Sequence, residues 1–588
     1  MDEQRTQNSM LARACKTKSG RMLTSALLTL ALVGLTAALF PITFLTNDDT
    51  SIMYALAGYY TGSPYPVHGF IGLPLGYLTS ALYSVLPGVP WWPVLQLLAV
   101  GASAWVVFLA ILGEGRQPLF SLGLSLTLYA TVFVYAVARL SFTLTACMLG
   151  TAGVVHLLSA DTRDHIGVKR MRGIYASSLA LMALCFLFRN STGYSLACFW
   201  AAAVVYHALN DSFYPEKPEK KRALLRLGGY ALTGGVLFLA LVLLNGWAYT
   251  NLNPTEYAAF EAARGEYMDF PHVTYEEDPE FFASIGWDEE TYDLVEQFCF
   301  LDENVTAEAL NAIVEHTQTE ETGILAQLSG ALAYGESFFR GNGPAEYMLV
   351  FPVLLALWSL VWFFREKRRA IDVLIVAGLA LGAFALCFYL CMKQRLIVRS
   401  FQVIAVPMAA ACAPLALRIR AANPPQRKHA AKTALRGALI VLTLLAVCWS
   451  VTKSWLWLGT YDPAELNANV RTVEAYAMEH SDNAYIYAPR TLKNYEAFKT
   501  YPDEKPTNLI DWGDTGMYSG WKTLQIEQNG IESFSAEMFR QDNVFLIGKT
   551  DASDLQTLLG YLQKHDGASG LETLDTIGTD YAVFRVVY

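Results

Sequence analysis

The sequence predicts a polytopic α-helical membrane protein that ends in an extracytoplasmic α/β domain. Hydrophobic residues make up 53% of its 588 residues and charged residues only 16%, and the mean hydropathy is +0.29. Such values place most of the chain in lipid rather than in a water-soluble core. The hydrophobic residues also gather in segments of membrane-spanning length. Only two long stretches, 251–344 and 461–588, are polar enough to lie in water.

About eleven segments satisfy the hydropathy criterion for a transmembrane helix. They are 22–45, 94–112, 119–138, 140–158, 174–188, 194–209, 227–249, 347–364, 371–391, 401–417 and 438–458. Segment 70–86 is apolar too, but it contains Gly72, Pro74 and Gly76 and runs into further prolines. Because helix breakers at this density favour a re-entrant or juxtamembrane segment, we expect 70–86 not to cross.

The positions of Lys and Arg predict the orientation of the chain. Basic residues precede the first span, which has no evident cleavage site, so the N-terminus is expected in the cytoplasm with that span retained as an anchor. If 70–86 does not cross, the basic loops 163–172, 217–226, 365–369 and 418–436 also face the cytoplasm. The expected location is therefore the cell membrane, with the C-terminal domain outside.

This topology divides the chain into five parts. They are a cytoplasmic N-terminus (1–21), an N-terminal transmembrane module (22–250) with its first outer loop (46–69), an acidic extracytoplasmic helical insertion (251–344), a C-terminal transmembrane module (345–460) and the extracytoplasmic α/β domain (461–588). The insertion has only Arg264 and Arg340 against many acids. A solvated outer face explains this acidity, and a metal or cationic partner is the alternative, although no calcium-loop spacing is present.

Short strands alternate with helices in the C-terminal domain, which predicts an α/β fold. A helix is expected from Pro463 to about His480 with Asp462 as its N-cap, and another over 554–565 capped by Ser553. The expected strands are 484–488, 544–548 and 581–588. Between them, 508–521 combines Trp and Tyr with Asp, a composition that suits sugar binding and equally suits a loop packed on a membrane or domain surface.

Two kinds of site can be set aside. The nine cysteines lie mostly in apolar segments, and Cys299 alone falls in an outer segment, so no disulfide framework or zinc spacing is present. The basic residues are spread over short loops rather than gathered in a patch, which argues against nucleic-acid binding.

The first candidate site residues are Asp48 and Asp49, directly after the first span. Acids at the mouth of a span are either the first solvated residues of a loop or a working site. Adjacent carboxylates repel each other, so one of them can serve as a base near neutral pH. The polar, aromatic-rich segment 53–68 follows and ends at His68, a weaker candidate because a lone histidine more often makes a local hydrogen bond.

The second group consists of basic residues at the outer ends of predicted spans, where the orientation rule disfavours them. They are Arg139, Arg189, Lys393, Arg395 and Arg399. They either neutralise the acid pair or bind an anionic group, and their excess over two acids favours the anion. Arg395 and Arg399 are four residues apart, so a helix would place them on one face.

The layout resembles the GT-C superfamily of integral-membrane glycosyltransferases, and the chain is similar to uncharacterised bacterial polytopic membrane proteins. The resemblance rests on the first span, the acid pair after it, the Tyr-Thr-Gly-Ser-Pro run, many further spans, the acidic outer loop and the soluble tail. No Trp-Trp-Asp signature of oligosaccharyltransferases is present, which leaves the subfamily and acceptor open.

The resemblance implies a hexosyl or pentosyl transferase of the cell envelope. It would move a sugar from a polyprenyl-phosphate-linked donor to a glycan or other envelope acceptor at the outer face of the cytoplasmic membrane. Asp48 or Asp49 would act as general base or orient the acceptor, with a divalent cation, Mg²⁺ or Mn²⁺, as an option. His68 and the five bases would bind substrate, the bases at the lipid phosphate.

Two other classes stay open. A transporter or flippase of a lipid-linked glycan would also use charges near the membrane, but such proteins usually contain internal repeats with paired broken helices, and none is evident. A non-enzymatic surface receptor or scaffold would account for the outer parts of the chain and would leave the basic residues unexplained.

Overall fold

The computed structural model describes residues 15, 17–114, 117–160, 168–213, 220–319, 324–341, 343–367, 369–423, 430–460, 463–489, 492–513, 516–549 and 552–588. The chain divides into two compact units. The first, here the bundle unit, consists of Met1–Ile42, Val94–Val242 and Gln327–Tyr461. The second, here the polar unit, consists of Thr43–Pro93, Leu243–Ala326 and Asp462–Tyr588. Three separate stretches of sequence therefore build each unit.

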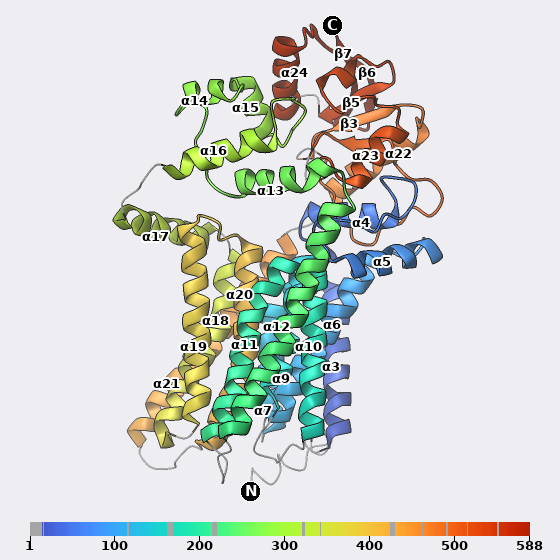
Figure 1. Cartoon of the computed structure of the whole chain (residues 1–588). Helices are drawn as coiled ribbons and strands as arrows, with labels where there is room; N and C mark the ends of the chain where they lie inside the picture. Colours follow the sequence, from blue (N-terminus) through green and yellow to red (C-terminus); the bar gives the residue numbers. More distant parts are fainter. Residues whose placement is uncertain are drawn as a thin grey trace. The chain divides into compact units, whose positions relative to one another are not determined.

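Long apolar helices make up the bundle unit (Figure 1). They are α3 (Lys18–Leu39), α6 (Trp91–Glu114), α7 (Pro118–Leu128), which continues through the π-helix η1 (Tyr129–Phe133) into α8 (Val134–Ala138), α9 (Phe142–Leu158), α10 (Val168–Phe188), α11 (Asn190–Phe213), α12 (Lys220–Asn251), α17 (Ile324–Gly341), α18 (Gly343–Glu366), α19 (Ala370–Met392), α20 (Val398–Ala422) and α21 (Ala430–Thr460). Two of these helices are largely enclosed: α9, in which every residue except His156 is buried, and α20, whose residues from Phe401 to Ile419 are buried.

Nine helices in the described part of the chain are long and apolar enough to cross a membrane. This confirms a multi-pass membrane protein, and it is two fewer than the eleven spans predicted. The predicted span 140–158 corresponds to α9, which has only 17 residues. The predicted span 194–209 lies in α11, which has 24 residues but begins with polar Asn190, Ser191 and Thr192 and is not among the nine.

Segment 70–86 forms α5 (Leu73–Val85), a helix of 13 residues that is not among the candidate spans. At 1.5 Å per residue it rises about 20 Å, short of the roughly 30 Å hydrocarbon core. Its length is consistent with the prediction that the segment does not cross.

Residues 251–319, the larger part of the predicted insertion 251–344, contribute a helical subdomain to the polar unit. Its helices are α13 (Thr255–Asp269), α14 (Pro279–Ser284), α15 (Glu289–Glu296) and α16 (Ala307–Thr319). They enclose a cluster of buried apolar side chains that includes Tyr267, Trp287 and Leu310. Two of the acids in this subdomain are N-cap residues. Asp278 and Asp288 accept hydrogen bonds from backbone N–H groups at the starts of α14 and α15.

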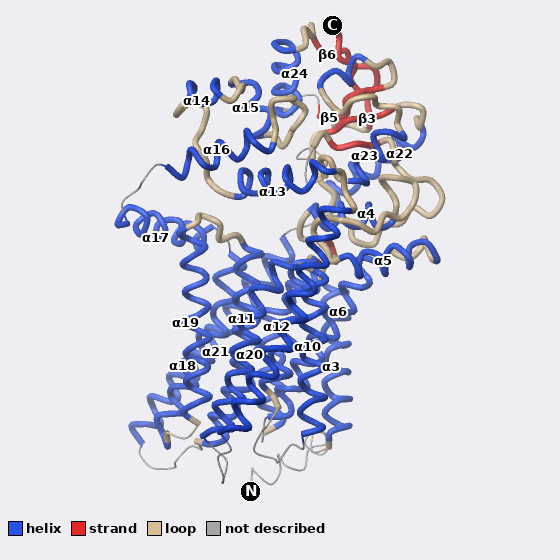
Figure 2. Tube along the Cα trace, in the orientation of Figure 1, coloured by secondary structure: helices blue, strands red, loops and turns tan. Residues whose placement is uncertain are grey.

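The C-terminal domain is a five-stranded sheet with helices on both faces, and it has the predicted α/β class (Figure 2). The strands β3 (Ala484–Tyr487), β4 (Leu509–Asp511), β5 (Val544–Lys549), β6 (Gly570–Ile577) and β7 (Tyr581–Val587) lie in the order β4-β3-β5-β7-β6. Strand β3 is parallel to β4 and β5, whereas β7 is antiparallel to β5 and β6. The helices are α22 (Ala464–Glu479), α23 (Gly520–Gln528), the 3₁₀-helix η2 (Ala536–Arg540) and α24 (Ser553–His565).

Alternate strand residues pack on opposite faces of this sheet, as the two-residue period of a strand requires. Ile486 and Leu546 pack with Leu558 of α24 on one face. Tyr485 and Ile547 pack with Val473 of α22 on the opposite face. One face of the sheet is therefore covered by α24 and the other by α22.

The predicted helix caps in this domain need correction. Asp462 lies outside the described residues, and α22 has Pro463 as its N-cap, with no side-chain hydrogen bond. Ser553, predicted to cap the helix over 554–565, is the first residue of α24, and Ala552 holds the cap position.

Candidate functional site

The acid pair lies in the first turn of α4 (Asn47–Ala57), within the predicted loop 46–69. Carboxylates are favoured there because the helix dipole is positive at its N-terminus. The helix ends at Gly58, whose φ of 75° is left-handed and whose Cβ, if present, would lie 2.2 Å from the backbone of Ser63. Glycine is therefore required for the chain to turn back beneath α4.

The two carboxylates have different surroundings. Asp49 is fully buried, and its Oδ1 accepts a hydrogen bond of 3.3 Å from Nε1 of Trp92. Asp48 is half-buried. Trp92 thus holds Asp49 in place, while Asp48 is the more accessible to a substrate. Adjacent helix positions are turned by about 100°, so the two carboxylates do not converge on one ion.

No group of three or more His, Cys, Asp or Glu that could hold a metal ion occurs among the residues the structure describes.

His68 is buried and neutral. Its Nδ1 accepts a hydrogen bond of 3.4 Å from the N–H of Phe70, which places the proton on Nε2. Burial lowers the pKa of His68 to about 4, against the smaller opposing effect of Asp48. The ring lies parallel to Trp521 with centroids 6.4 Å apart. His68 therefore carries no positive charge for a phosphate at neutral pH, and it can act only as a hydrogen-bonding group.

Arg139 and Arg189 are bonded within the bundle unit. Arg139 is buried and donates to the carbonyl oxygens of Pro41, Ala138 and Leu458 at 2.7, 3.0 and 3.0 Å. Arg189 donates to the hydroxyls of Ser191 and Thr143, and its guanidinium lies 4.7 Å from the centre of the Phe142 ring. These contacts hold helix ends together.

Lys393, Arg395 and Arg399 lie at the connection between α19 and α20. Lys393 is exposed at the C-cap of α19, and both arginines are half-buried. The two arginines would share one face only if the segment between them were helical, and it is not, because α20 begins only at Val398 and Gln394 has a left-handed φ of 49°. The acids and His68 belong to the polar unit, and all five bases belong to the bundle unit.

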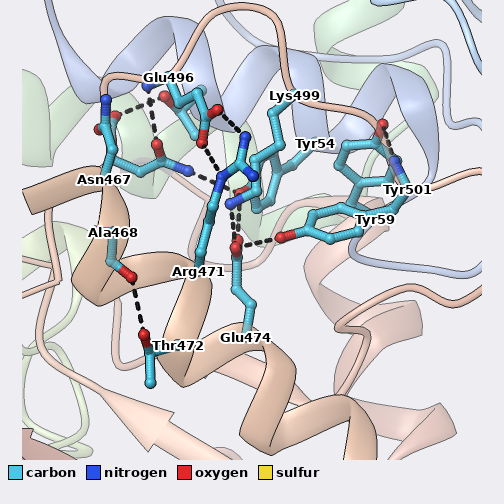
Figure 3. Close-up of polar contacts among 12 residues, drawn as sticks. Tyr54, Tyr59, Asn467, Ala468, Arg471, Thr472, Glu474, Glu496, Lys499 and Tyr501 are labelled. Atoms are coloured by element: carbon cyan, nitrogen blue, oxygen red, sulfur yellow. Dashed lines mark hydrogen bonds and ion pairs between the residues drawn. The ribbon is translucent and has the colours of Figure 1, made fainter. Parts of the chain in front are cut away.

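A buried ion-pair network that the sequence analysis missed joins α4 to the C-terminal domain within the polar unit (Figure 3). Glu474 of α22 accepts hydrogen bonds from the Tyr54 hydroxyl, the Lys499 ammonium and the Tyr501 hydroxyl. Lys499 also donates to the Tyr54 oxygen at 3.1 Å, and Asn494 donates to the same oxygen at 2.8 Å. Glu474 and Lys499 are both buried, so each needs the other as its counter-charge. Because Tyr54 of α4 donates to Glu474, this ion pair also fixes α4 to the C-terminal domain.

Burial dominates the electrostatics of this network. It raises the pKa of Tyr54 well above its usual value, and the neighbouring Glu474 carboxylate raises it further. Burial also lowers the pKa of Lys499, while Glu474 opposes that shift. Tyr54 therefore stays a protonated hydrogen-bond donor to Glu474 at all physiological pH values.

Beside this network, a pocket opens between one face of α4 and the C-terminal domain. Asn47, Thr50, Ser51 and Tyr54 line it from α4. From the C-terminal domain come Glu474, Tyr487, Asn494, Asp511 and Trp521, together with apolar side chains. Asp48 and Asp49 are on other faces of the helix and are not among the lining residues. The only sequence signal for this pocket is the Trp and Asp content of 508–521.

No protein-family model matches the chain, and no curated protein matches it. Among solved structures, ArnT from Cupriavidus metallidurans bound to undecaprenyl phosphate aligns over 96% of this chain and 98% of its own, with 10% identity and a TM-score of 0.40. The archaeal oligosaccharyltransferase AglB from Archaeoglobus fulgidus, in complex with an inhibitory peptide and a dolichol-phosphate, aligns over 92% of this chain and 70% of its own, with 11% identity and a TM-score of 0.40.

Proposed function

We propose that the protein is a membrane glycosyltransferase that moves a sugar from a polyprenyl-phosphate-linked donor to an acceptor at the outer face of the cytoplasmic membrane. One observation carries the proposal. The acid pair starts a helix that follows the first apolar helix in sequence and is bound through Tyr54 to a buried Glu474 of the C-terminal domain. Carboxylates that merely begin a solvated loop need no such support, whereas a catalytic carboxylate must be held in a fixed position.

In the proposed reaction, the acceptor hydroxyl attacks the anomeric carbon of the donor sugar. The half-buried carboxylate of Asp48 takes the hydroxyl proton, and the bond between the sugar and the lipid phosphate breaks with its electron pair going to the phosphate. Asp49, hydrogen-bonded to Trp92, is assigned a positioning role because it is fully buried.

The lipid phosphate gains negative charge as it leaves, and basic side chains would stabilise that charge. Lys393, Arg395 and Arg399 are better candidates than the other bases, because they are exposed or half-buried at a helix connection. Arg139 and Arg189, which bond to backbone and hydroxyl groups inside the bundle unit, are assigned a structural role rather than phosphate binding.

The test is transfer by the purified full-length protein in lipid, with mass spectrometry of the lipids that copurify. We expect a polyprenyl phosphate or its sugar conjugate to copurify. Asp48→Asn keeps the size of the side chain and removes its basicity, so transfer should fall on the order of a hundredfold. Asp542→Asn, at an exposed position of the same unit, is the matched control. Full activity of both the Asp48→Asn and the Asp49→Asn protein would remove the acid pair from the reaction.

A further inference from the structure

The pocket of the polar unit lies where an open parallel sheet would be expected to bind a ligand. Tyr487 and Asp511 are the last residues of the parallel strands β3 and β4, and they are direct partners in the sheet register. Both line the pocket. In open α/β sheets, ligands bind outside the carboxyl ends of the parallel strands. Here α4 closes this edge with its face of Asn47, Thr50, Ser51 and Tyr54.

The charged side chains in the pocket do not favour an anionic ligand. Glu474 and Asp511 are the charged side chains in its described lining, which includes no Lys, Arg or His. Each acid forms an ion pair with a buried lysine that does not line the pocket. Lys499 contacts Glu474, and Nζ of Lys522 lies 3.0 Å from Oδ1 of Asp511. The pocket therefore offers no unbalanced positive charge to a phosphate or a carboxylate.

Neutral polar groups remain for a ligand. Asn47 and Ser51 lie one turn apart on the lining face of α4, both half-buried, and neither side chain has a hydrogen-bond partner among the described residues. Thr50 differs, because its hydroxyl donates to the carbonyl of Asn494 at 2.7 Å. An amide and a hydroxyl one helical turn apart supply both donors and acceptors, which suits neighbouring hydroxyl groups on a ligand.

Trp521 forms a rigid wall of the pocket. It is buried, and its ring is stacked on Tyr60 with centroids 4.4 Å apart and an angle of 14°. Tyr60 covers one face of the ring and Trp521 is only 2% exposed, so hydrogen bonds rather than ring stacking would select the ligand.

We propose that this pocket binds a neutral saccharide unit through Asn47 and Ser51. The assignment of that saccharide as the acceptor glycan rests on the proposed function, whereas binding itself does not. The site would thus bind the hydroxyl groups of an uncharged sugar by hydrogen bonds and would not bind sugar acids.

The test is saturation-transfer difference NMR on the full-length protein in nanodiscs, with maltotriose and triacetylchitotriose as neutral probes and trigalacturonate as the charged one. We expect at least one neutral trisaccharide to bind and trigalacturonate not to bind. Asn47→Ala and Ser51→Ala should each weaken binding about five- to tenfold, as expected for one or two lost hydrogen bonds. Ser533→Ala is the matched control, since Ser533 is exposed and outside the pocket.

The pocket assignment is overturned if neither neutral probe binds, if trigalacturonate binds as tightly, or if the Asn47→Ala/Ser51→Ala double variant binds as wild type does. Asp48→Asn separates this proposal from the proposed function, because it should lower transfer on the order of a hundredfold and leave saccharide binding intact. Binding without any transfer by the wild type would refute the enzyme and keep the pocket. Transfer without saccharide binding would refute the pocket alone.

Discussion

His68 predicts a specific loss of stability in acid. The perturbation is His68→Asn, in which the amide oxygen can replace Nδ1 as acceptor for the Phe70 N–H and no group titrates. The folded protein holds the pKa of His68 at about 4, compared with 6.5 for an unperturbed histidine. Between these two pH values the unfolded chain binds a proton that the folded chain does not, so stability falls as the pH falls.

The size of the effect follows from the pKa difference. The full loss, reached below pH 4, is about 3 kcal/mol at 1.36 kcal/mol per pKa unit. At pH 5 the unfolded histidine is almost wholly protonated and the folded one is not, so about 2 kcal/mol is lost. Above pH 6.5 the contribution is complete and does not change.

The assay is thermal unfolding of the purified protein and the His68→Asn variant at pH 7.5 and pH 5. Comparing each protein with itself across pH cancels the constant cost of the smaller side chain. We expect the wild type to lose about 2 kcal/mol more than the variant between the two pH values, which corresponds to roughly 4–8 °C for a unit of this size. Equal losses in the two proteins would show that His68 is not held neutral by burial.

Three further predictions follow from single features. Lys499→Met leaves Glu474 buried without its counter-charge and should cost about 3–5 kcal/mol by thermal unfolding; the double variant with Glu474→Gln should regain most of this, and a fully stable single variant would contradict the network. Changing Arg395 and Arg399 to Gln should weaken binding of a polyprenyl phosphate with little loss of stability, and Lys should restore it only partly; unchanged affinity would remove both from the site. Cys299 is fully buried in the apolar core of the polar unit, so a membrane-impermeant maleimide should label it only after heat unfolding; labelling of the folded protein would disprove that burial.

The membrane character of the chain follows from the sequence, because hydropathy is a property of one contiguous segment. The same local reasoning identified β3, β5 and β7, whose apolar runs or alternation mark them as strands. It missed β4, which has only three residues, and β6, whose side chains are largely exposed at the sheet edge. Neither strand carries a hydrophobic pattern long enough to be recognised.

The roles of the charged residues were decided by tertiary structure. The acid pair could be located from sequence, but burial of Asp49 under Trp92, with Asp48 left half-buried, could not. The Tyr54–Glu474 bond joins residues 420 positions apart, and the Tyr54–Lys499 bond joins residues 445 positions apart. A sequence lists every charge, but the partner that makes a charge tolerable inside a protein is set by which distant segments the fold brings into contact.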